Sequence, residues 1–169
     1  MSVRNVKHFL ERAASLDEAA FVAELVDHVL VQVDASAGSV GAGDAEVTAK
    51  IDPGMIRRQA ESSRDTTVHS LPRGEAAISV GRVPASDVQI AHSSVSKQHA
   101  RLLWRGEELM VEDLGSTNGT WVNRVKLSPN DPHRARPDDT LRFGQGDAYL
   151  VMTPKAFFNY LQMLRRFGI

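Results

Sequence analysis

The sequence contains no cysteine, almost no net charge and no long apolar run, and each absence argues against a class of function. Without cysteine the chain forms no disulfide, iron–sulfur cluster or cysteine-ligated zinc site, and it performs no thiol catalysis. A net charge of −1 argues against a nucleic-acid partner, which a basic surface would attract. The most apolar stretch, residues 21–33, is interrupted by charged and polar side chains, so we expect no membrane span.

The six histidines are spread along the chain without the spacing of metal ligands, so we expect neither a metal nor another cofactor. The N-terminus lacks the apolar core and cleavage site of a targeting segment, which predicts a soluble, cytoplasmic protein. The charge is unevenly divided. Residues 1–60 hold six basic and nine acidic side chains, and residues 61–169 hold fourteen and twelve.

Residues 1–34 carry apolar residues at helical spacing and are predicted to form two helices. Ser15 and Glu18 match the capping box S-x-x-E, which predicts that the second helix begins there. Its apolar face would contain Val22, Leu25, Val26, Val29, Leu30 and Val33. Residues 35–63, rich in Gly, Ala and Ser, read as a linker, with a candidate short helix over 53–62.

Residues 64–153 change to short apolar runs separated by turn residues, which is typical of a β-sandwich or barrel. We expect strands near residues 66–70, 77–82, 87–91, 99–104, 108–113, 120–122, 125–127, 133–136, 140–143 and 147–153. Residues 154–169 predict a further helix, N-capped by Thr153, with Phe157, Leu161 and Leu164 on one face. The apolar faces of the predicted helices would pack on the sandwich, self-associate or dock a partner.

Four motifs in the β region carry polar chemistry: Val80-Gly81-Arg82, Ser96-Lys97-Gln98-His99, residues 113–120 (DLGSTNGT) and residues 138–144 (DDTLRFG). Arg82 offers a planar fork that suits a phosphate or a carboxylate, and Lys97 adds a point charge. Ser96 and Thr117 offer neutral donors, and Asn118 can both donate and accept, as a peptide backbone requires. If these loops converge, they form a phosphate pocket without a catalytic base.

In this order and spacing, the motifs resemble the forkhead-associated (FHA) domain, a phosphothreonine-peptide-binding module. The resemblance implies a sandwich of about ten to eleven strands in two twisted sheets, with the ligand at loops of one end. It also implies that Arg82, Ser96, Lys97 and Thr117 contact the phosphate and that Asn118 holds the ligand backbone. Gly81, His99 and Gly119 would be structural, with His99 bracing the loop that presents Ser96.

Two turns depart from the family pattern. Asn123-Arg124 stands where Asn-Gly is common, which predicts a looser turn or one of another type because arginine tolerates positive φ less well than glycine. Asp138 replaces the usual glycine of a later turn. Neither departure falls on a residue expected to contact phosphate.

An enzyme interpretation finds less support. Ser94–Lys97 (S-x-x-K) and Ser116–Asn118 (S-x-N) match two of the three motifs of serine penicillin-recognising enzymes, but no K-T-G element follows them. The S-x-x-K also leads into a predicted strand. We therefore expect a non-catalytic protein that acts as an adaptor in Ser/Thr kinase signalling.

Its partner would be a threonine-phosphorylated protein or peptide, and a Ser/Thr kinase is a candidate partner as well. An alternative is a scaffold whose helices bind the partner, with the FHA-like domain structural or self-inhibited. Thr48 in the linker, and Thr66 and Thr67 before the domain, are candidate phosphorylation sites for such self-inhibition.

Overall fold

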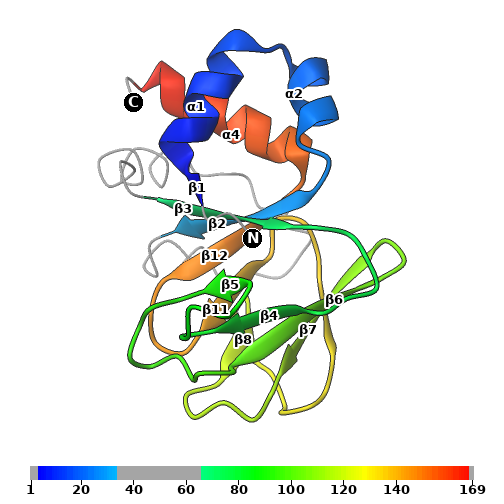
Figure 1. Ribbon diagram of the computed structural model, residues 1–169, viewed down its shortest axis with the longest axis vertical. Coiled ribbons are helices and arrows are strands. Elements are labelled where there is room, and N and C mark those ends of the chain that lie inside the picture. The colour runs from blue at the N-terminus through cyan, green and yellow to red at the C-terminus, as the bar shows by residue number, and fades with distance from the viewer. Residues whose placement is uncertain (1–3, 34–65, 168–169) are drawn as a thin grey trace.

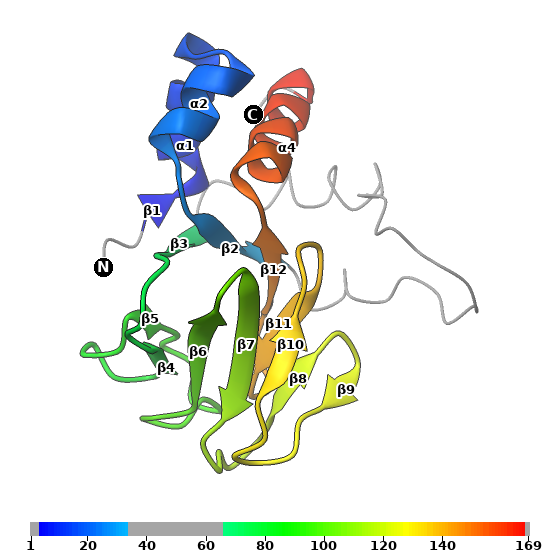
Figure 2. The same ribbon diagram turned by 90° about the vertical axis from the view of Figure 1, so that its right-hand side faces the viewer.

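Two β-sheets stacked as a sandwich form the body of the protein, and helices cover one end of it (Figures 1 and 2). In the computed structural model, the residues described are 4–33 and 66–167. The first sheet has the order β1 (Arg4–Asn5), β3 (Thr67–Leu71), β2 (His28–Val33), β12 (Ala148–Met152), β11 (Thr140–Phe143), β8 (Thr120–Val122) and β9 (Val125–Lys126). The second has the order β10 (His133–Ala135), β7 (Glu108–Asp113), β6 (Ala100–Arg105), β4 (Ile78–Gly81) and β5 (Val88–Gln89).

The core of the sandwich lies between the two sheets. Inward-facing residues include Leu102 and Val111 of the second sheet and Leu141 and Phe143 of the first, each at most 1% exposed. Antiparallel ladders fix the register, and only β4 and β5 pair in parallel among the described strands. The ten strands expected between residues 66 and 153 are all present, within about two residues of the expected bounds.

The second predicted helix forms, but its predicted continuation through Val33 is wrong, because only the part before Leu25 is helical. Helix α2 covers Glu18–Glu24, and β2 then inserts between β3 and β12 as a strand of the first sheet. Val29, Val31 and Val33 face the helices, whereas Leu30 faces the sandwich core. Val29, Leu30 and Val31 are buried on alternating faces of this strand, and an apolar run this short does not separate a strand from a buried helix.

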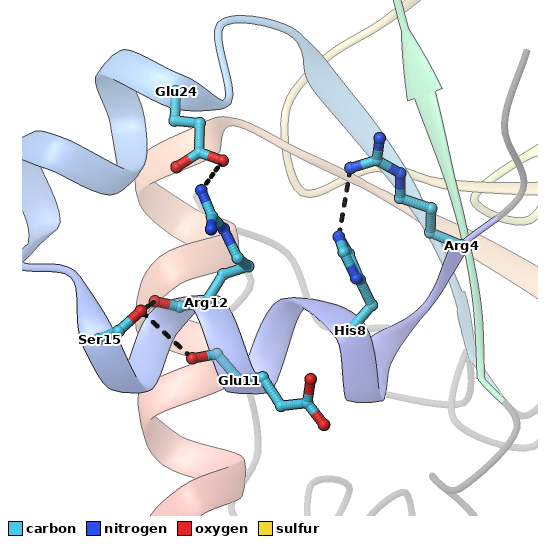
Figure 3. Close-up of polar contacts among 6 residues, drawn as sticks. All are labelled: Arg4, His8, Glu11, Arg12, Ser15 and Glu24. Atoms are coloured by element: carbon cyan, nitrogen blue, oxygen red, sulfur yellow. Dashed lines mark hydrogen bonds and ion pairs between the residues drawn. The ribbon is translucent and has the colours of Figure 1, made fainter.

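The expected capping box is also wrong. The Ser15 hydroxyl donates back to the carbonyl of Arg12 (3.1 Å) at the end of α1 (Val6–Ser15), and Asp17 caps α2 by accepting from the Ala20 N–H (2.8 Å). Figure 3 shows Ser15 pointing back along α1 and the ion pair between Arg12 and Glu24 that joins the two helices.

Helix α4 (Pro154–Arg166) packs with α1 and α2 on the outer face of the first sheet. It begins as predicted, with Thr153 accepting from the Ala156 N–H (3.2 Å). Phe157 is fully buried and meets the Phe9 ring edge-on, with centroids 5.1 Å apart. The apolar faces of the helices are therefore covered within the chain, by each other and by β2, β3 and β12. The predicted linker at residues 35–63 and its short helix lie outside the described residues.

Candidate functional site

Three loop segments meet through hydrogen bonds: the residue after β4, the β5–β6 loop and the β7–β8 loop. The Arg82 N–H donates to the carbonyl of Ser96 (3.0 Å), and the Thr117 N–H donates to the Ser96 hydroxyl (3.2 Å). The Asn118 side-chain amide donates to the carbonyl of Ser94 (2.8 Å). Ser96 therefore lies between Arg82 and Thr117, although the three residues come from three segments of the chain.

Arg82 is held at the end of β4 with an exposed side chain. Its Nε donates to the carbonyl of Val95 (3.1 Å), which fixes one edge of the guanidinium. Its two terminal nitrogens donate to no residue in ranges 4–33 and 66–167, so they can donate to an anion. A β-carbon on Gly81 would lie 2.1 Å from the Lys97 carbonyl oxygen. Only glycine lets this strand end meet the β5–β6 loop so closely.

The neighbouring side chains add neutral donors and a second cation. The Ser96 hydroxyl accepts from the Thr117 N–H and keeps its own hydrogen for a ligand. The Thr117 and Lys97 side chains are exposed beside it. Asn118 is half-buried, and its bond to Ser94 leaves its carbonyl oxygen and second amide hydrogen for a further partner. This arrangement can bind a tetrahedral anion attached to a peptide.

His99 joins the two main loops from beneath. Its Nδ1 accepts from the Ser96 N–H (3.0 Å), so its Nε2 carries the hydrogen and donates to the Gly119 carbonyl (2.9 Å). The ring is fully buried, and burial lowers the pKa of His99 below its ordinary value, which keeps the imidazole neutral. The neutral form is required because only it can accept at one nitrogen and donate at the other. Gly119, at φ 87°, adopts the positive φ expected of it.

Asp113 at the end of β7 organises the β7–β8 loop from within. One carboxylate oxygen accepts from the backbone N–H groups of Gly115 and Ser116 (both 2.9 Å), and the other accepts from the hydroxyls of Ser116 and Thr120 (both 2.6 Å). Burial alone would raise the pKa of Asp113, but these four donors outweigh it and hold the pKa below its ordinary value. The carboxylate therefore fixes the turn that carries Thr117 and Asn118.

Ser94 and His92 have the appearance of a nucleophile and its base but fit a structural role. The Ser94 hydroxyl lies 2.7 Å from His92 Nδ1 and accepts from the Gln145 N–H (2.8 Å). His92 Nδ1 also accepts from the Ser94 N–H (3.2 Å), and His92 is exposed. The pair thus ties the β5–β6 loop to the β11–β12 turn. In the described part of the chain, no other residue orients the His92 ring, as a catalytic base requires.

A model of the FHA domain family matches residues 78–144, which contain every loop described above. The chain carries an FHA domain. Its sequence is 43% identical over 53 residues to FraH of Nostoc, covering 31% of this chain and 18% of FraH. It is 44% identical over 54 residues to FhaB of Mycobacterium tuberculosis, covering 32% and 35%. It is 36% identical over 78 residues to the glycogen accumulation regulator GarA of Mycolicibacterium smegmatis, covering 46% and 48%.

The chain thus matches less than half the length of these relatives. Among solved structures, the FHA domain of the CT664 protein from Chlamydia trachomatis is 21% identical with a TM-score of 0.48, over 74% of this chain and 96% of that one. An FHA domain of an Arabidopsis thaliana protein is 26% identical with a TM-score of 0.48, over 51% and 73%.

The structure brings the five predicted ligand-binding residues of the FHA domain into adjoining loops, and their contacts with a ligand remain predictions. Two of the candidate phosphorylation sites, Thr66 and Thr67, lie at the start of β3 and not in these loops. Thr66 is 5% exposed and its carbonyl accepts from the Val6 N–H (3.0 Å), so a kinase would reach it only after the chain opens locally. Thr67 pairs with Asn5 of β1, and Thr48 lies outside the described residues.

Sequence reasoning did not assign roles to Asp113 and Ser94, which position the FHA loops. Asp113 had a recognisable pattern, since an aspartate followed by Ser116 three residues later favours an Asx-type turn. Ser94 had none, because its partners Asn118 and Gln145 are distant in sequence. No group of three metal-ligating side chains occurs among residues 4–33 and 66–167. None of the helices described is long and apolar enough to cross a membrane.

Proposed function

We propose that this chain is a non-catalytic adaptor whose FHA domain binds a threonine-phosphorylated segment of a partner protein. The observation that carries the proposal is the placement of Arg82. Its guanidinium is anchored through Nε to Val95, and its backbone is bonded to Ser96, so a cationic fork stands beside a hydroxyl donor. The family resemblance adds that this set binds phosphothreonine.

Each residue has a distinct task in the proposed complex. Arg82 donates to two phosphate oxygens, the Ser96 and Thr117 hydroxyls donate one hydrogen bond each, and Lys97 adds charge. Asn118 holds the ligand backbone next to the phosphothreonine. His99 and Asp113 position these groups without contacting the ligand. A Ser/Thr kinase would supply the phosphate, and a cytoplasmic location, where such kinases act, remains a prediction.

The helices support this adaptor role more than a scaffold role. The apolar faces that a partner or a second copy would need are buried against β2, β3 and β12. The Phe9 and Phe21 rings each pack against Phe157, with centroids 5.1 and 6.3 Å away. Helix α4 also donates from Gln162 to the carbonyl of Ala13 at the end of α1 (2.8 Å). The helical layer is thus an integral part of the folded unit.

The test is a titration of a phosphothreonine peptide library against the wild-type chain and the Arg82→Ala variant. Two charge-assisted hydrogen bonds of about 1.5 kcal/mol each predict a loss on the order of 100-fold in affinity. Arg105→Ala is the matched control, because Arg105 is an exposed arginine at the far end of β6. Equal binding by wild type and Arg82→Ala would overturn the proposal, as would equal binding of the unphosphorylated peptides.

A further inference from the structure

A row of two cations and one tryptophan crosses the part of the first sheet that the helices leave uncovered. Trp121 of β8 pairs in register with Lys126 of β9 and with Arg142 of β11. The Arg142 guanidinium lies 4.3 Å from the centroid of the Trp121 ring, and the Lys126 ammonium lies 5.5 Å from it. We call these three residues the Trp121 row. The helical layer covers the same face only over β2, β3 and β12.

The cations of the Trp121 row are not neutralised within the described chain. Lys126 and Arg142 form no ion pair with a carboxylate in ranges 4–33 and 66–167, although other cations such as Arg12 and Arg134 do. An indole face attracts a cation but does not cancel its charge. Two positive charges held on one ring therefore repel each other until an anion approaches.

The Trp121 row adjoins the proposed phosphate site. A β-carbon built on Gly119 would lie 2.5 Å from Cε and 3.3 Å from Nζ of Lys126, and 3.3 Å from Cη2 of Trp121. The lysine side chain therefore passes directly over the backbone that follows Asn118. A peptide bound at Thr117 and Asn118 would bring its flanking residues within reach of Lys126 and then of Arg142.

We propose that the Trp121 row is a second subsite of the phosphopeptide site and binds acidic side chains that flank the phosphothreonine in the same ligand. The inference rests on the proposed function. The indole face holds the Arg142 guanidinium over the ring, where its nitrogens can donate to a carboxylate. Because Arg142 covers a face of the indole, Trp121 is poorly placed to stack on a nucleic-acid base. This favours a peptide over a nucleic acid as the ligand of the Trp121 row.

The test compares phosphothreonine peptides of one core sequence by fluorescence anisotropy: one with alanine flanks, one with two glutamates before the phosphothreonine and one with two after it. We expect one of the acidic peptides to bind the wild-type chain about fivefold more tightly than the alanine peptide. This ratio should fall as salt is raised, because exposed charges are screened. In Lys126→Gln and Arg142→Gln, which keep long side chains beside Trp121, the ratio should fall toward one.

The control is Arg166→Gln, an exposed cation in the last turn of α4, which should keep the wild-type ratio. A ratio of one in the wild type, while Arg82→Ala still weakens all three peptides, would overturn this inference and leave the proposed function intact. Wild-type binding that ignores phosphorylation would overturn the proposed function and this inference with it. Tight binding of an oligonucleotide that is lost in Arg142→Gln would assign the Trp121 row to nucleic acid instead.

Discussion

Replacing Asp113 by asparagine changes the group around which the β7–β8 loop is folded while keeping its shape. Asparagine can still accept from the N–H groups of Gly115 and Ser116 through its oxygen. Its amide nitrogen takes the place of the oxygen that accepts from the hydroxyls of Ser116 and Thr120, each 2.6 Å away. Thr120 is fully buried, so its hydroxyl cannot turn to water. The substitution therefore removes two charge-assisted hydrogen bonds and weakens two others.

The magnitude follows from these contacts. A hydrogen bond to a charged group contributes about 1.5–3 kcal/mol, and the two hydroxyls recover part of it by rotating to accept from the new amide. We expect the free energy of unfolding to fall by about 2–4 kcal/mol. Phosphothreonine-peptide affinity should fall about tenfold or more, since the loop carrying Thr117 and Asn118 loses its support.

The assay is urea unfolding followed by tryptophan fluorescence, with peptide titration on the same samples. Asp131→Asn is the control, because Asp131 is an exposed aspartate in a neighbouring loop. In the wild type the pKa of Asp113 is depressed, so the carboxylate stabilises the folded chain fully above pH 3.8, the ordinary value. This stabilisation is lost as the pH falls through the lower pKa of the folded state. Asp113→Asn should lose that acid dependence. A variant with the wild-type urea midpoint and affinity would refute this account of the loop.

Two further predictions concern the core. Burial lowers the pKa of His69 to about 4 and also lowers the pKa of His99, so both rings are neutral in the folded chain. The free energy of unfolding should therefore be highest above pH 6.5. Below pH 6.5 it should fall by up to about 1.4 kcal/mol per pH unit for each histidine, because the unfolded chain binds the proton more readily. Urea midpoints at pH 7.5 and 5.0 measure this loss. If the His69→Leu variant loses as much stability between the two pH values as the wild type does, the prediction for His69 is contradicted. Phe157→Ala should lower the free energy of unfolding by about 3–5 kcal/mol in the same assay and leave peptide affinity unchanged, because Phe157 is fully buried. Phe167→Ala, at an exposed position, is the control and should be nearly neutral. Equal urea midpoints for the two variants would refute the buried packing of Phe157.

The β-sandwich was predictable because each of its strands in residues 66–153 is short and bounded by turn residues. The C-terminal helix was predictable from Thr153 and Pro154, which act at its start as expected. Strand β2 was not, since HVLVQV is short, buries Leu30 on the face opposite Val29 and Val31, and follows soon after a true helix. Which of two structures such a run adopts depends on its neighbours β3 and β12, which are distant in the sequence.

The convergence of the candidate binding residues was predictable because an ordered set of motifs carries them, and the loops do bring Arg82, Ser96 and Thr117 together, while their contacts with a ligand stay predictions. The turn at Asn123-Arg124 resolves differently from the family pattern: Asn123 takes the positive φ (55°), which asparagine tolerates better than most residues. The supporting hydrogen bonds of Ser94 and the Trp121 row could not be predicted, because strand register and loop contact decide them.

The central claim is that a phosphothreonine peptide binds at the loops that hold Arg82, Ser96, Thr117 and Asn118. An NMR titration of the nitrogen-15-labelled full chain with a phosphothreonine peptide, and with the same peptide unphosphorylated, tests it most directly. The account predicts that only the phosphorylated peptide shifts resonances, that the largest shifts fall on these four residues and the Arg82 side-chain N–H, and that those of α1 and α4 hardly move. Shifts centred on the helices, or equal shifts with the unphosphorylated peptide, would contradict it.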